Sequence, residues 1–347
     1  MRKRLAIIGA GPAGLAAAWE LRQADFDVVV FEKSRGLCGR AASRTRHGVR
    51  IDPGANFIKT GSPEIERLLR QQLPADDLAE IVGDVWTHTA DHELHPGDPN
   101  LNREAKWTYR SGISTLGKLL AAASGAEIIR ETRIGRLDRK KDGWEVFDSA
   151  GDSRGVFDRL LLTPPAPQTI ELLEASGLSS QTWASSLIKG LRPAEFHRQF
   201  CFAFGFEGDL ERPGDFHASL NPDGRHPIAW LSFENDKPGH VPHGLTVVVC
   251  QMQPSWSATH FEDHTAGLAE IARRDLTRLL RWPDAKPEWF DAQRWKFAHP
   301  VAAADSALTR AGESHGLFIA GDALIGKGRV NRALETGLAA ARRIAAS

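Results

Sequence analysis

The chain has 347 residues, 41% of them hydrophobic and 25% charged, so it is long enough to form about two globular domains. Lys plus Arg and Asp plus Glu balance at 44 each, which argues against a nucleic-acid-binding protein, and no apolar run approaches the roughly 18 residues of a membrane span. Three scattered cysteines are too few for a disulfide framework or a zinc site, so we expect a cytoplasmic protein without a bound metal.

The first 32 residues contain a strand, a glycine-rich turn, a helix and a second strand that ends in an acid. The apolar residues 5–8 lead into Gly9, Gly11 and Gly14, and the second strand ends at Glu32. In dinucleotide-binding folds these glycines allow a tight turn, approach to a pyrophosphate and close helix packing. The helix N-terminus attracts the phosphates, and the acid accepts hydrogen bonds from ribose hydroxyls. The order of these parts predicts an adenine dinucleotide site.

Three basic residues before the first strand, at positions 2–4, imitate the start of a secretion signal. The glycine pattern explains the same stretch better, because removing it would delete the first strand of the nucleotide site. We therefore interpret it as part of the fold.

The next segments add a loop and a helix. The loop at residues 33–40 contains glycines that allow close approach to the dinucleotide, and Arg40 can reach a phosphate. A short buried segment follows at residues 51–57. Ser62 and Pro63 are typical of a helix start, with the serine as cap.

The middle of the chain alternates between β-strand patterns and helices. We expect strands at residues 127–137, 144–147, 156–162, 200–206, 230–233 and 245–250, and helices at residues 113–120 and 265–280. The aromatic alternation at residues 200–206 predicts an antiparallel sheet, and one side of that strand must pack in a core.

A second strand–loop–helix unit lies near the end of the sequence. The apolar residues 317–320 precede Gly321 and Asp322, and a small-residue helix covers residues 330–346. A carboxylate at the strand end can bind the ribityl chain of a flavin, and the helix N-terminus can stabilise negative charge on the reduced flavin. This second unit favours FAD over NAD.

Seven further segments carry a resemblance to a known family: residues 33–40, 52–55, 165–168, 237–239, 256–260, 294–295 and 321–330. In these segments the chain resembles the renalase branch of the flavin amine oxidase superfamily. Two departures are Cys38, where a glycine is usual, and the pair Asn331 and Arg332, where Gly and Glu are more frequent. The resemblance implies an α/β fold: a discontinuous Rossmann-type FAD-binding domain with an inserted mixed-sheet substrate domain.

From this resemblance and the motifs above we expect domain boundaries and a set of contacts to non-covalently bound FAD. The FAD-binding domain would comprise residues 1–58, 101–165 and 290–347, and the substrate domain residues 59–100 and 166–289. The expected cofactor contacts are Gly9, Gly11, Pro12, Ala13, Gly14, Glu32, Lys33, Gly39, Arg40, Gly54, Ala55, Asn56, Ile134, Gly321, Asp322, Arg329, Val330, Arg332 and Ala333.

The resemblance also implies an activity. Renalase-like enzymes oxidise 2- or 6-dihydro-NAD(P) by hydride transfer to flavin N5, and dioxygen then accepts the electrons to give hydrogen peroxide. Because the dihydronicotinamide becomes aromatic, stacking on the flavin is the main requirement and no general base is needed. We expect Asn56, Trp230, Asn235 and His260 to line or orient the substrate, with the amides and the imidazole bonding its carboxamide.

Other interpretations remain open. The same scaffold serves amine oxidases, protoporphyrinogen oxidases and desaturases, and a non-catalytic flavin-binding protein is a third alternative. The histidines at positions 88, 92 and 95 have a spacing that can imitate a metal site, but interspersed acids favour a solvated loop. Arg332 could add positive charge at the flavin edge or change the substrate.

Overall fold

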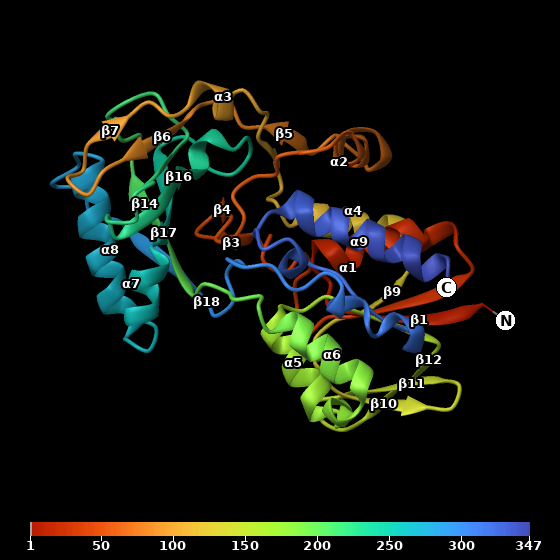
Figure 1. Ribbon diagram of the computed structural model, residues 1–347. Helices are drawn as coiled ribbons and strands as arrows, with labels where there is room; N and C mark the ends of the chain where they lie inside the picture. The colour runs from red at the N-terminus through yellow and green to blue at the C-terminus, as the bar shows by residue number, and fades with distance from the viewer. Residues whose placement is uncertain (1) are drawn as a thin grey trace.

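The computed structural model describes residues 2–347 and has two lobes (Figure 1). The first lobe is built on a parallel sheet with the strand order β19-β13-β1-β2-β9. Its strands are β1 (Lys3–Ile8), β2 (Phe26–Phe31), β9 (Glu127–Ile129), β13 (Arg159–Leu162) and β19 (Leu317–Ile319). β1 is central and mostly apolar, as expected for a parallel strand covered on both faces.

Three helices cover one face of the parallel sheet. They are α1 (Pro12–Glu20), α4 (Thr115–Ser124) and α9 (Val330–Ala345), and their apolar residues share one core with β1. Small residues let α1 and α9 approach closely, since a Cβ on Gly337 would lie 2.1 Å from the carbonyl oxygen of Ala13. The C-terminal helix is thereby fixed to the helix that follows the glycine-rich turn.

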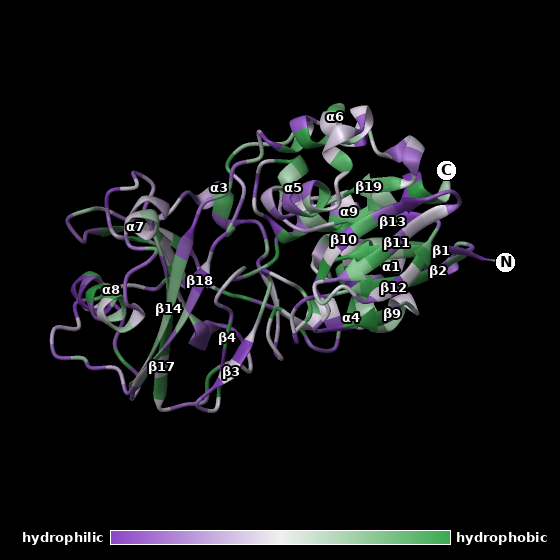
Figure 2. Ribbon diagram, turned by 90° about the horizontal axis from the view of Figure 1, so that it is seen from below, coloured by the Kyte–Doolittle hydropathy of each residue, from purple (hydrophilic) through white to green (hydrophobic). Residues whose placement is uncertain are grey.

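The opposite face of the parallel sheet carries a small antiparallel sheet and two helices. The small sheet contains β10 (Ile134–Lys140), β11 (Gly143–Asp148) and β12 (Ser153–Phe157), and the helices are α5 (Ala166–Ala175) and α6 (Thr182–Leu191). They share a second core with Leu160 and Leu162 of β13. Figure 2 shows the hydrophobic strands of this lobe enclosed between these layers.

The second lobe contains a mixed sheet with the order β18-β14-β17-β16-β15-β6-β7. Its strands are β6 (Val85–His88), β7 (Leu94–His95), β14 (Gln199–Glu207), β15 (Ala218–Leu220), β16 (Ile228–Phe233), β17 (Leu245–Met252) and β18 (Trp289–Trp295). All neighbouring pairs are antiparallel except β15 and β6. Two segments distant in sequence therefore complete one sheet.

The two faces of this sheet have different neighbours. Phe200, Phe202, Phe204 and Phe206 of β14 pack in a core with helix α8 (Thr265–Leu279), and the short helix α7 (Pro254–Thr259) lies on the same side. The other face carries smaller residues, which pack against a hairpin formed by β3 (Arg44–Arg46) and β4 (Val49–Ile51). This second face is turned toward the first lobe (Figure 1).

Short elements connect the lobes. They are α2 (Pro63–Arg67) with a π-helical turn at Leu68–Gln72, β5 (Leu78–Glu80), α3 (Pro99–Asn102) and β8 (Trp107–Tyr109). Ser62 caps α2 as predicted, because its side chain accepts a hydrogen bond from the amide of Ile65. No helix within residues 2–347 is both long and apolar enough to cross a lipid bilayer.

The predicted fold class is confirmed, but two apolar runs are divided between sheets. Residues 127–137 form β9 and β10 with a turn at Glu131, whose φ is 56°, and residues 156–162 span the end of β12 and all of β13. The predicted boundaries also differ from the observed layers. α5 and α6 pack on the parallel sheet rather than in the substrate lobe, and β18 belongs to the mixed sheet.

Candidate functional site

The glycine-rich turn between β1 and α1 has the geometry of a phosphate site. Gly9 has a φ of 104°, and a Cβ on Gly14 would lie 2.1 Å from the carbonyl oxygen of Gly9. A Cβ on Gly11, in contrast, would meet no atom within 4 Å, so this glycine leaves open space in front of the turn. α1 has neither a side-chain cap nor an acid in its first turn. Its first amides are therefore available to an anion.

Glu32 is held rigidly at the end of β2. Its carboxylate accepts hydrogen bonds from the amides of Ala10 at 2.9 Å and Ser34 at 2.8 Å, and the residue is 6% exposed. Each carboxylate oxygen retains a further lone pair that a ribose hydroxyl can use. Ile134, another predicted contact, is also buried, and it lies close to Glu32 because the amide of Thr132 bonds the Glu32 carbonyl oxygen. The side chain of Lys33 is exposed.

The loop at residues 38–40 joins the two halves of the site. The amide of Cys38 bonds the carbonyl oxygen of Ala10 at 2.8 Å, which places the loop over the glycine-rich turn. Arg40 then reaches Asp322, with its Nη2 atom 2.8 Å from Oδ1. Gly54 lies against the same loop, because a Cβ there would be 1.9 Å from the carbonyl oxygen of Arg40. The structure thus brings together segments from both ends of the sequence.

The C-terminal half supplies a carboxylate and a second helix N-terminus. Gly321 has a φ of 132°, and Asp322 beside it is 6% exposed. α9 begins at Val330 without a side-chain cap or an acid in its first turn. Arg332 is exposed, and its guanidinium bonds Glu335 at 2.8 Å.

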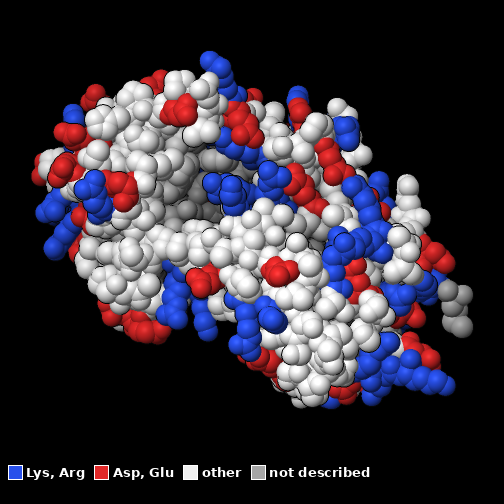
Figure 3. All heavy atoms as spheres, in the orientation of Figure 1, with Lys and Arg blue, Asp and Glu red and all other residues white. Residues whose placement is uncertain are grey.

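His299 was not predicted as a site residue, although it lies in the middle of this basic region. Its side chain packs against Gly328, where a Cβ would be 2.3 Å from the His299 Cβ. Burial, followed by the charges of His197, Arg329 and Arg40, lowers the pKa of His299 to about 4. Figure 3 shows a hollow between the lobes with Lys and Arg atoms at its edge. Arg40 and Arg329 can attract the negative charge of a diphosphate.

The residues present fit FAD. Its diphosphate requires space and N–H donors, which the open space in front of Gly11 and the uncapped N-termini of α1 and α9 provide. Its hydroxyls require acceptors, which the carboxylates of Glu32 and Asp322 provide.

A polar face of the mixed sheet lies beside Gly54. Asn56 is 8% exposed and bonds the Ser232 hydroxyl at 2.6 Å, while Gln251 donates from Nε2 to the carbonyl oxygen of Gly54. Trp230 pairs with Gln251 across β16 and β17, and its ring lies 5.8 Å from that of Phe57. Asn56 and Trp230 are therefore neighbours, as predicted. Ser232 and Gln251 were missed, although polar residues on otherwise apolar strands are a sequence signal for a functional face.

The other two predicted substrate residues lie elsewhere. His260 ends α7, on the Phe side of the mixed sheet, where it bonds Asp263 at 2.7 Å and packs on Trp256. Asn235 bonds the backbone of Leu245 and Val247, at the opposite end of β17 from Gln251. Both side chains already have local partners. The structure corrects these two predictions. The sheet separates His260 from the polar face, and both polar atoms of the Asn235 side chain bond the backbone of β17.

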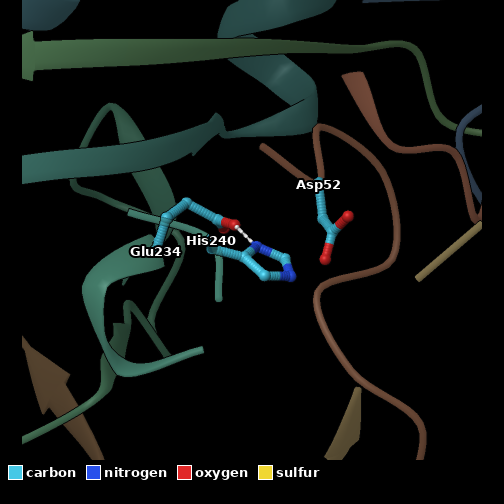
Figure 4. A group of neighbouring side chains, drawn as sticks. All are labelled: Asp52, Glu234 and His240. Carbon is cyan, nitrogen blue, oxygen red and sulfur yellow. Dashed lines mark hydrogen bonds and ion pairs between the residues drawn. The ribbon is translucent and has the colours of Figure 1, made fainter. Parts of the chain in front are cut away.

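A buried group of four charged side chains joins the lobes next to Gly54. Figure 4 shows Asp52, Glu234 and His240 converging, and Lys237 completes the group. The Lys237 ammonium lies 3.1 Å from Asp52 and 2.7 Å from Glu234, and His240 Nδ1 lies 2.8 Å from the other Glu234 oxygen. None is more than 1% exposed. We call these four residues the charge cluster.

Neighbours within the charge cluster shift the pKa values of Glu234 and Lys237. Burial alone would raise the pKa of Glu234, but Lys237 and the hydrogen bond from His240 lower it to about 2. Burial alone would lower the pKa of Lys237, but Asp52 and Glu234 raise it. His240 lies between the Glu234 carboxylate, 2.8 Å from Nδ1, and the Tyr109 carbonyl oxygen, 3.1 Å from Nε2. Glu234 thus has both Lys237 and His240 as partners, and Lys237 also bridges to Asp52.

Asp52, Glu234 and His240 also form a group of potential metal ligands within residues 2–347. The Lys237 ammonium, however, already occupies the position between the two carboxylates. A divalent cation there would face a positive neighbour at close range. The cluster is thus better described as an ion-pair network than as a metal centre.

The histidines of the first insertion differ from the predicted solvated loop. His88 is 1% exposed and bonds Ser219 and the carbonyl oxygen of Ile228. His92 bonds His226 at 3.0 Å, whereas His95 is exposed and adjoins Glu93. The rings of His88 and His92 both contact His226, at centroid distances of 4.8 and 4.9 Å, whereas His95 does not join them.

Comparison with known proteins identifies two families along the chain. Residues 7–72 match an NAD(P)-binding Rossmann-like domain, and residues 88–345 match the flavin containing amine oxidoreductases. Protoporphyrinogen oxidase 2 of Arabidopsis thaliana is 38% identical over 79 residues, which is 21% of this chain. The chain spans only 16% of the length of that relative in the alignment.

Solved structures extend the similarity to the whole fold. A provisionally assigned protoporphyrinogen oxidase from Exiguobacterium sp. 255-15 aligns over 100% of this chain and 99% of its own, with a TM-score of 0.80 and 15% identity. A redesigned triple mutant of putrescine oxidase aligns over 99% of both chains, with a TM-score of 0.74 and 13% identity. At these identities the likeness supports the fold.

Proposed function

The chain belongs to the flavin containing amine oxidoreductase family, and from that membership we propose that this FAD-dependent oxidoreductase oxidises a dihydronicotinamide. The proposed substrates are the 2- and 6-dihydro isomers of NAD(P). A C–H bond of the dihydropyridine breaks with both electrons, and the ring becomes an aromatic pyridinium. The hydride equivalent and one proton then reduce dioxygen to hydrogen peroxide. FAD, when bound, supplies the acceptor for the hydride.

The composition of the polar face beside Gly54 carries this proposal. Asn56, Trp230, Ser232 and Gln251 offer hydrogen bonds, yet none of them can act as a general base near neutral pH. An oxidation driven by aromatisation needs no base, because no proton leaves the reacting ring. These side chains would orient a carboxamide-bearing ring and limit the water around it.

We propose that FAD is bound without a covalent link. Cys38, Cys201 and Cys250 are all buried, and burial raises the pKa of each, that of Cys38 to about 12. The thiolate is the nucleophilic form of cysteine, so these thiols are unreactive. Glu32, Arg40 and Asp322, together with the N-termini of α1 and α9, would hold the cofactor.

A porphyrinogen or amine substrate is the second candidate, because the similar proteins include a protoporphyrinogen oxidase and a putrescine oxidase. Many amine oxidases use a lysine near flavin N5. Lys237 is unsuited to that role here, since it is fully buried between Asp52 and Glu234. The hydrogen-bonding side chains of the polar face are also a poor match for a large apolar macrocycle.

Anaerobic rapid mixing of the flavin-loaded protein with a panel of donors tests the proposal. We expect 2- or 6-dihydro-NAD(P) to bleach the flavin absorbance within seconds, and ordinary NADH and simple amines to react slowly. Admission of air should restore the absorbance and yield hydrogen peroxide. Rapid bleaching by an amine or a porphyrinogen, with no response to any dihydronicotinamide isomer, would replace the first candidate by the second.

A further inference from the structure

We infer that Trp230 and Asn56 form a pair of hydrogen-bond donors that selects substrates carrying a carbonyl oxygen next to the reacting ring. This inference rests on the proposed function and specifies how its site recognises a substrate. The substrate would be selected by its hydrogen-bond acceptor as well as by its shape, because two particular N–H groups require one.

The indole N–H of Trp230 is the first donor. Its Nε1 atom is buried but has no hydrogen-bond partner anywhere in residues 2–347. A buried donor without an acceptor is costly, and most such groups in folded proteins are paired. Because Ser232, two residues along β16, bonds Asn56, the alternation of the strand places Trp230 on the same face of the sheet. The unpaired donor therefore belongs to the polar face beside Gly54.

The amide of Asn56 is the second donor, and its orientation is fixed. One Asn56 nitrogen hydrogen points at the carbonyl oxygen of Gly54, 3.2 Å away, and a carbonyl oxygen can only accept. Oδ1 then faces the hydroxyl of Ser232 at 2.6 Å. The Gly54 contact fixes the assignment of oxygen and nitrogen, and the Ser232 hydroxyl, which can donate, then bonds the oxygen. One N–H of Asn56 consequently remains for a ligand.

Phe57 fixes the position of the first donor. The rings of Phe57 and Trp230 are 5.8 Å apart and tilted by 57° to each other, which restricts the indole. The indole N–H of Trp230 has no partner and Asn56 has one N–H to spare, and a carbonyl oxygen, which has two lone pairs, can accept from both. A carboxamide or carboxylate satisfies them, whereas an alkylamine or a hydrocarbon ring leaves them unpaired.

The test uses the flavin-loaded protein and two oxidised dinucleotides. One is NAD⁺, and the other is the same dinucleotide with a pyridinium ring that has no carboxamide. Binding is measured by the change that each produces in the flavin absorbance. Trp230→Phe removes the N–H and keeps an aromatic ring. Trp256→Phe is the matched control, because Trp256 lies on the Phe side of the same sheet, against His260.

We expect Trp230→Phe to weaken NAD⁺ binding about tenfold and to change binding of the carboxamide-free dinucleotide less than twofold. Trp256→Phe should leave both unchanged. Equal losses for the two dinucleotides, or wild-type protein that binds both equally, would overturn the inference. A flavin spectrum that differs between ligand-free Trp230→Phe and wild-type protein would also overturn it, because the indole N–H would then bond the flavin rather than the substrate. If wild-type protein oxidises dihydronicotinamides in any of these cases, the proposed function survives and only this inference fails.

Discussion

Replacement of Lys237 by Gln should destabilise the protein strongly. Lys237 is the ammonium that lies 3.1 Å from Asp52 and 2.7 Å from Glu234 in a fully buried setting. Removing one partner of a buried ion pair costs about 3–5 kcal/mol, because the remaining carboxylates lose their counter-charge. An unfolding entropy of about 2.1 cal/mol/K per residue over 347 residues converts this loss to a fall of about 4–7 °C in Tm.

Thermal unfolding of the wild-type and variant proteins measures this loss. Lys286→Gln is the matched control, since Lys286 is exposed, and we expect its Tm to stay within about 1 °C. The pair Asp52→Asn and Lys237→Gln completes a double-mutant cycle, in which the double variant should be more stable than the sum of the single losses. Strict additivity, or a Lys237→Gln protein as stable as the control, would refute the assignment of a coupled charge cluster.

Three further predictions concern pH, the glycine-rich turn and the corrected residues. The pKa of Glu234 is about 2 in the folded protein and 4.5 for a free side chain, so its ionised form stabilises the fold above pH 4.5 and this stability is lost as the pH falls toward 2. In acid denaturation, the free energy of unfolding of Glu234→Gln protein should fall less steeply than that of wild type between pH 4.5 and 2. Gly14→Ala should destabilise the fold by about 1–3 kcal/mol, because its Cβ would overlap the Gly9 carbonyl oxygen. Gly11→Ala should leave the Tm of flavin-free protein unchanged, because Gly11 has a φ of −77° and a Cβ there meets open space. Gly11→Ala should nevertheless weaken FAD binding at least tenfold, measured by titration of FAD fluorescence. His260→Ala should leave the rate of flavin reduction by every donor within twofold, and a larger loss would return His260 to the site.

Much of the cofactor half could be predicted because its signals are local. The turn from β1 to α1 depends on glycines whose spacing is fixed by a single strand–helix connection, so the roles of Gly9 and Gly14 follow from sequence. The pairing of Arg40 with Asp322 could be expected only in outline, since it joins residues that are far apart in the chain. His299 gave no local signal, because it enters the site through the packing of its loop on Gly328.

The substrate half was predicted less well for a geometrical reason. The alternation of Phe200 to Phe206 shows that one face of β14 is buried, but it does not show which lobe the other face meets. His260 and Trp230 could therefore both be placed near the sheet, and only the position of α7 separates them. The division of residues 127–137 into β9 and β10 was also hidden, because both strands are short and partly apolar.

The order of the central sheet has a consequence for how the protein acquires its coenzyme. β1 lies between β2 and β13, and the edge strand β19, which leads to Asp322, is made about 310 residues after β1. A ribosome therefore releases the glycine-rich turn and Glu32 long before Asp322 exists. Contacts so remote along the polypeptide form slowly. Coenzyme capture must then be among the last events of maturation, and the yellow colour of freshly made protein would report that the whole chain has reached its native state.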